Sequence, residues 1–262
     1  GPTDFSTQAE SALKVAAQIA KKNDAKIYLL NILEMPVHLS DLMSSGSSGP
    51  GPEALFFMKQ THKKFEEVLE QDYLKDIEVI ETVSFEGILD GIIDASKKNN
   101  VDMIIMGSHG SSGFEELFIG SNAEKVVRTS KQPVLVIKED CDIFDVKDFV
   151  YATNFDDEDK PCLLAAYEFA KSIEANLHLV RINTANGFKT TNETEEKMNN
   201  MVSSLPIDNY TLNIYNDITV EKGILNFAHS LDAGIIGIST HGRKGISHFI
   251  NGSLGEDVVN HA

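Results

Sequence analysis

The chain has 262 residues, of which 42% are hydrophobic, and it carries a formal net charge of −17. This length fits one large domain or two ordinary ones, and the negative charge argues against nucleic acid as a partner, because its phosphates would be repelled. No apolar run long enough to span a membrane is visible, and neither is a signal peptide. The two cysteines, Cys141 and Cys162, are too few for a disulfide framework. We therefore expect a cytoplasmic protein with no membrane contact.

The first half alternates predicted helices with predicted strands. Apolar residues at three- and four-residue spacing predict helices, and uninterrupted short apolar segments predict buried strands. A segment rich in Ser, Gly and Pro, residues 40–52, predicts a loop. The helices are expected at 9–22, 53–74, 88–98 and 121–130, and the strands at 27–33, 77–83, 103–106 and 134–137.

The second half repeats this order. Strands are expected at 149–153, 177–182, 210–215 and 234–238, and helices at 163–173, up to 203, at 220–231 and from Ser253, with a polar loop at 183–193. Short apolar strands separated by helices predict parallel sheets covered on both faces, with ligands at the edge where strands lead into helices. We therefore expect two α/β domains, at residues 1–140 and 147–262.

The two halves differ at their outer ends. Only Gly1 and Pro2 precede Thr3, whereas Asn154, which aligns with Asp4, follows a full predicted strand. The first half also continues into the strand 134–137, which has no counterpart after Ala262. Each half is therefore short of one strand, and we expect the natural chain to contain further residues.

A glycine-rich segment occurs once in each half. Its first copy contains Gly107, Gly110, Gly120 and Ser121, and its second copy begins at Ile238. Glycines before a helix allow backbone N–H groups to approach an anion closely, so the segment predicts a phosphate site in each half. An alternative is a capping box made by Ser121 and Glu124, which would explain the serine but not the glycines.

This segment resembles the nucleotide-binding signature of the universal stress protein family, and the resemblance covers the chain as a tandem of two such domains. PTDFS, NIL and SKQPVLVIK support it. The resemblance implies two Rossmann-like domains with parallel five-stranded sheets, order 3-2-1-4-5, and helices on both faces. It also implies ATP, AMP or ADP as ligand, Mg²⁺ accompanying the nucleotide, a role in the stress response, and packing of the halves as an intramolecular pseudo-dimer, with a homodimer as a further option.

The family's site residues carry over onto matching positions of each half. In the first half the nucleotide is expected at Pro2, Thr3, Asp4, Ile32, Met106, Gly107, His109, Gly110, Gly120, Ser121, Asn122 and Ala123. In the second half a weaker site is expected at Thr153, Asn154, Ile182, Ser239, His241, Gly242, Arg243, Gly252, Ser253 and Leu254. Asn154 loses the charge of Asp4 and Ser239 adds a Cβ where backbone and ligand would approach, while Arg243 adds a cation, so we expect the first site to bind more tightly.

Several alternatives stay open at this point. His109 and His241 are expected to be turn residues, and we predict no catalytic residue and no metal site made by protein side chains. Asp4 could also cap the following helix, and the acidic run 156–159 predicts a solvated turn and helix start. The functions considered are a nucleotide-binding regulatory protein, a weak ATPase or self-phosphorylating enzyme, and an interaction protein with vestigial pockets or another small ligand.

Overall fold

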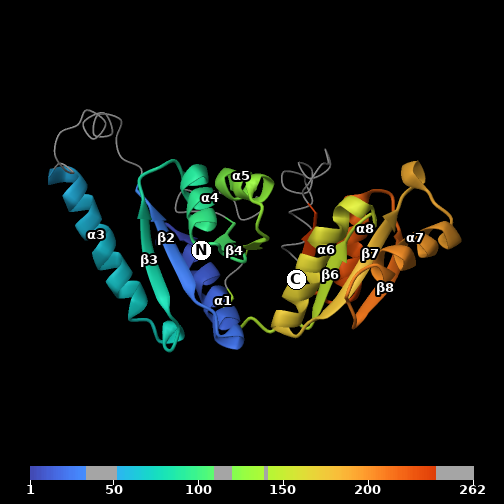
Figure 1. Cartoon of the computed structure of the whole chain (residues 1–262), viewed down its shortest axis with the longest axis horizontal. Coiled ribbons are helices and arrows are strands. Elements are labelled where there is room, and N and C mark those ends of the chain that lie inside the picture. Colours follow the sequence, from blue (N-terminus) through green and yellow to red (C-terminus); the bar gives the residue numbers. More distant parts are fainter. Residues whose placement is uncertain (34–51, 109–119, 139–140, 240–262) are drawn as a thin grey trace. The chain divides into compact units, whose positions relative to one another are not determined.

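The computed structural model describes residues 1–33, 52–108, 120–138 and 141–239 (Figure 1). Its contacts divide the chain into two compact units, Gly1–Phe144 and Asp145–Ala262. Both units alternate strands and helices, as the sequence pattern predicts. Within the described ranges, no helix is long and apolar enough to cross a membrane.

In unit 1 the helices and strands follow the expected order with shifted ends. The predicted helix 53–74 ends early, because Gln71 takes an extended conformation with ψ 135° and a separate 3-10 turn follows. The elements are β1 Pro2–Thr3, α1 Thr7–Asn23, β2 Ile27–Ile32, α3 Pro52–Leu69, η1 Asp72–Leu74, β3 Val79–Ser84, α4 Ile88–Lys98, β4 Ile104–Gly107, α5 Ser121–Thr129 and β5 Val134–Ile137.

The strands of unit 1 form two hydrogen-bonded sheets. One has the order β1-β2-β3 and the other pairs β4 with β5, and all the pairs are parallel. Strand β1 also contacts β4, but no ladder of hydrogen bonds joins the two in the described part of the chain. The single five-stranded sheet expected from the family is therefore divided at β1, which is only two residues long.

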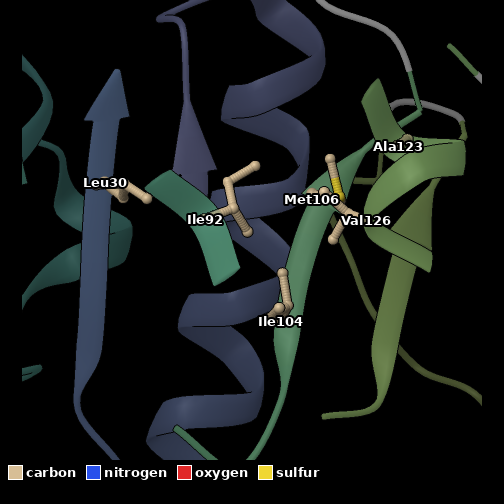
Figure 2. Close-up of a cluster of buried hydrophobic side chains, with 6 residues drawn as sticks. All are labelled: Leu30, Ile92, Ile104, Met106, Ala123 and Val126. Atoms are coloured by element: carbon tan, nitrogen blue, oxygen red, sulfur yellow. The ribbon is translucent and has the colours of Figure 1, made fainter. Parts of the chain in front are cut away.

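Helices cover both faces of the strands in unit 1. Helices α4 and α5 pack on one face through Ile92, Ala123 and Val126, which meet Leu30, Ile104 and Met106 of the strands (Figure 2). On the other side α1 buries most of its apolar stripe, including Val15, which is fully buried. The fully buried Phe65 of α3 meets the ring of Phe5 edge-on, with 5.3 Å between the ring centres.

Unit 2 has one four-stranded parallel sheet in the order β8-β7-β6-β9. Its elements are β6 Asp148–Ala152, η2 Asp157–Asp159, α6 Lys160–Ile173, β7 Asn176–Asn183, η3 Ala185–Gly187, α7 Thr191–Ser203, β8 Tyr210–Asn216, α8 Val220–Ser230 and β9 Ile235–Ile238. Val180 and Ile182 face α8, and the alternation of side chains turns Leu179 to the opposite face. The predicted loop 183–193 contains η3 and the first turn of α7, which Thr190 and Glu193 cap reciprocally.

The segment between the expected domain limits is divided between the two units. Asp142 pairs with Lys14 of α1 at 2.8 Å, and the backbone N–H of Phe144 donates to the Gln18 side chain at 2.8 Å. Val146 instead lies against Gly234, just before β9. These contacts explain why the first unit extends past residue 140 and why the second begins before residue 147.

Candidate functional site

The turn after β1 presents Asp4 at the carboxyl edge of the strands. The hydroxyl of Thr3 accepts the backbone N–H of Phe5 at 3.0 Å, and Phe5 has a left-handed conformation with φ 62°. Asp4 Oδ1 accepts the N–H and the hydroxyl of Ser6, and Ser6 caps α1 by accepting the N–H of Ala9. Asp4 is therefore not itself the helix cap. It holds the capping residue in place while its side chain stays exposed.

The start of α5 lies at the end of β4. The N–H of Ser108 donates to Ile137 at 2.8 Å, and the N–H of Gly120 donates to the Ser108 carbonyl at 2.7 Å. Gly120 is the N-cap residue of α5 and, as a glycine, has no side chain with which to cap this helix end. Unpaired N–H groups at a helix start attract anions.

The capping box expected at this position does not form. Ser121 is the first residue inside the helix, and Glu124 pairs with Arg128 at 3.0 Å. A capping box needs its serine one position earlier, where the chain has Gly120. The reading of this motif as a capping box is therefore wrong in unit 1.

Gly107 is required by helix packing. A Cβ at this position would lie 2.9 Å from the backbone oxygen of Gln8 in the first turn of α1. At the matching position of unit 2, the Ser239 hydroxyl lies 3.5 Å from the sulfur of Cys162 in α6. In both units this position faces a helix, so the expectation that Ser239 adds a Cβ against the ligand is wrong.

Two expected site residues, Met106 and Ala123, can offer only their backbone to a ligand, and two others are partly buried. The side chains of Met106 and Ala123 belong to the core beneath α4 and α5, and they are 6% and 2% exposed (Figure 2). Ile32 packs close to Gly91 of α4, and Pro2 is half-buried in β1. Ser121 and Asn122, by contrast, have exposed side chains at the start of α5.

Unit 2 repeats the turn after its first strand. The Thr153 hydroxyl accepts the N–H of Phe155 at 3.0 Å, and Phe155 is left-handed with φ 57°. The acidic run then begins the helix as predicted, with Asp156 and Asp159 capping η2 reciprocally. Asp159 is 8% exposed and accepts the Thr153 hydroxyl at 2.8 Å, so this carboxylate is buried and not solvated as expected.

Arg181, which the sequence pattern did not indicate as a site residue, lies near the end of β7. Its Nη1 donates to the backbone oxygen of Asn154 at 3.0 Å. In unit 1 the matching side chain is Asn31, whose Nδ2 donates to the backbone oxygen of Thr3 at 2.8 Å. Aligning LLNIL with LVRIN would have exposed this exchange of Asn for Arg. Beside it, Ile182 packs tightly on Gly223 of α8.

The remaining expected site residues lie outside the described residues: His109, Gly110, His241, Gly242, Arg243, Gly252, Ser253 and Leu254. Among the residues that are described, no three His, Cys, Asp or Glu side chains gather in a way that could hold a metal ion.

A depression of about 350 Å³ lies away from these turns, at the amino end of β7. Tyr167, Asn176 and Asp208 contribute to its wall, and the Tyr167 hydroxyl donates to Asp208 at 2.6 Å. This hydrogen bond raises the pKa of Tyr167. Ligands of open α/β sheets bind at the carboxyl ends of the strands, so we do not assign the nucleotide to this depression.

Comparisons with known proteins identify the family. The profile described as the universal stress protein family matches residues 1–138. A universal stress protein of Methanocaldococcus jannaschii is 33% identical over 146 residues, which are 53% of this chain and 79% of the relative. A second from the same organism is 31% identical over 148 residues, 52% of this chain and 91% of the relative. The crystal structure of a universal stress protein from Archaeoglobus fulgidus covers 100% of this chain and 91% of its own, with 23% identity and a TM-score of 0.58. The chain belongs to the universal stress protein family.

Proposed function

We propose that this protein is a cytoplasmic stress-response regulator that binds an adenine nucleotide, mainly in unit 1. The observation that carries the proposal is the position of two segments at the same edge of neighbouring strands. Asp4 stands exposed after β1, and α5 begins beside the end of β4, which contacts β1, with a glycine as its N-cap. A carboxylate can accept ribose hydroxyls, and backbone N–H groups at a helix start can donate to phosphates.

Each group of the nucleotide has a matching partner in unit 1. The hydroxyl of Ser121 and the backbone N–H groups after Gly120 would bind the phosphates, and the backbone of Ile32 would border the base. A Mg²⁺ ion would be held chiefly by the phosphates, because this ion keeps several waters and needs few protein carboxylates.

A nucleotide-binding regulator should hydrolyse ATP slowly or not at all, and this distinguishes it from an enzyme. Phosphoryl transfer needs a residue that positions the nucleophile and groups that neutralise the developing charge. The described turns supply phosphate donors but no side chain assigned to either role. We expect ATP turnover below about one per minute, far under the roughly 1 to 1,000 per second of ordinary enzymes. Faster hydrolysis, or a stable phosphorylated form made from ATP, would favour the weak-enzyme alternative.

The test is the replacement of Gly120 by valine. A β-branched side chain at this N-cap would stand where phosphate oxygens approach the helix, so we expect ATP affinity in unit 1 to fall at least tenfold. Gly87 provides a matched control, because it is also a glycine N-cap without a side-chain cap, and a Cβ there would meet its nearest atom at 3.9 Å.

Binding is measured by calorimetric titration of ATP with Mg²⁺ into the full chain. The Gly87→Val variant should keep the wild-type affinity. If Gly120→Val binds ATP as tightly as wild type, the unit 1 site is wrong. If neither wild type nor variant binds ATP or AMP, the interaction-protein alternative gains support.

A further inference from the structure

Arg181 and Asn31 perform the same structural task with different charges. Each lies near the end of the second strand of its unit. Asn31 donates to the backbone oxygen of Thr3, the last residue of β1, and Arg181 donates to that of Asn154, in the turn after β6. A neutral amide is sufficient to hold the end of the first strand in unit 1. The positive charge in unit 2 is therefore not needed for the turn and calls for another explanation.

The guanidinium of Arg181 has no carboxylate partner in the described part of the chain. The side chain is half-buried, its Nε is buried without a hydrogen-bond acceptor, and its one hydrogen bond is to Asn154. Burying a charge is costly unless an opposite charge compensates for it. A bound anion would provide that compensation.

The neighbouring charges are engaged with other groups. Lys197 of α7 pairs with Asp156 at 2.6 Å, so this cation is already neutralised. Asp159 accepts the Thr153 hydroxyl and the N–H of Asp156. Within the described residues, Lys160 and Lys197 each pair with a carboxylate of the acidic run, whereas Arg181 pairs with none.

At the position of Asp4, unit 2 has the neutral Asn154, and the carboxylates of Asp156 and Asp159 that follow it are engaged by Lys197 and by the Thr153 hydroxyl. We propose that Arg181 binds a phosphate group and that unit 2 accepts a nucleotide that carries a second phosphate on a ribose hydroxyl, whereas unit 1 accepts the free ribose hydroxyls. This inference rests on the proposed nucleotide function. In dinucleotide-binding folds an acidic residue binds a ribose hydroxyl, and in other members an arginine nearby accommodates a phosphate on that ribose. The planar guanidinium can donate two hydrogen bonds to one phosphate.

The experiment compares adenosine, AMP and adenosine 3′,5′-bisphosphate on the full chain by hydrogen–deuterium exchange. Peptides covering 150–160 and 178–184 report on unit 2, and peptides covering 1–8 and 104–108 report on unit 1. In unit 2 of the wild type, half-maximal protection should need about ten- to a hundredfold less bisphosphate than AMP, as expected for a charge-assisted hydrogen bond to phosphate. Arg181→Gln should abolish this difference, and Arg181→Lys should retain part of it.

Lys197→Gln is the matched control, because it removes a neighbouring cation that is already paired, and it should keep the preference for the bisphosphate. Equal protection of unit 2 by AMP and bisphosphate in the wild type would overturn the inference, as would an unchanged preference in folded Arg181→Gln. The wild-type comparison decides the question even if this variant fails to fold. Unit 1 peptides that respond to no ligand would instead refute the proposed function of unit 1.

Discussion

Replacing Gly107 by alanine tests the packing of β4 on α1. The added Cβ would lie 2.9 Å from the Gln8 backbone oxygen and 3.1 Å from its carbonyl carbon, whereas ordinary contacts begin at 3.4 Å. The first turn of α1 must therefore move by about 0.5 Å, the difference between 3.4 and 2.9 Å. This neighbour is helix backbone and cannot rotate away as a side chain would.

Overpacking of this kind costs about 1 to 3 kcal/mol. For a unit of this size each kcal/mol lowers the melting temperature by about 2 to 4 °C, so we expect a decrease of roughly 2 to 12 °C. Movement of the first turn of α1 also displaces the preceding turn with Asp4, so ATP affinity should fall as well.

Differential scanning calorimetry without nucleotide provides the measurement, because it can resolve two units that unfold separately. Gly87→Ala is the control, since a Cβ there would meet only the Asp90 carboxylate at 3.9 Å. If Gly107→Ala melts within about 1 °C of this control, then α1 and β4 do not pack as tightly as described.

Two further substitutions test unit 2. Thr190→Ala removes one half of the capping box at the start of α7 and should cost about 1 kcal/mol in urea unfolding. An unchanged midpoint would show that the box does not stabilise the helix. His178 at 2.8 Å and Asn176 at 3.1 Å hold the pKa of Asp148 below its ordinary value. Because the pKa of Asp148 is lower in the folded protein than in the unfolded chain, its carboxylate stabilises the fold at pH values above the unfolded pKa of about 3.9. This contribution is lost as the pH falls through the pKa of Asp148 in the folded protein. The stability difference between wild type and Asp148→Asn should therefore shrink below about pH 4, and a difference that stays constant with pH would contradict the assignment.

Much of the fold follows from local sequence. The apolar segments around 27–32 and 104–107 are short, uninterrupted and separated by amphipathic helices, and this pattern requires a parallel sheet with two covered faces. The helix limits were less predictable at Gln71, where an extended residue breaks an otherwise continuous pattern. The predicted loop 183–193 is too long at its end, because Thr190 and Glu193 cap each other's backbone and start α7 at Thr191.

The segments that form the candidate site could be predicted from the sequence, but the roles of their individual residues could not. Repetition of the glycine motif identified the strand ends and the helix start that meet at one edge. The role of an individual residue changes when its place in a helix or strand differs by one position from the predicted one. Ser121 lies inside α5 and not at its cap, and the missing Cβ of Gly107 leaves space for the first turn of α1.

The family, the alternation of strands and helices, and the glycine-rich segment repeated in each half can be read from the amino-acid sequence, because these depend on the order and spacing of residues along the chain. The groups that each side chain contacts are known only from the folded chain. It places Met106 and Ala123 in the core, and it shows that Asn31 and Arg181 bind the backbone at the end of the first strand of their units with different charge. The physical reason is that burial and pairing of charges depend on neighbours brought together from distant parts of the chain.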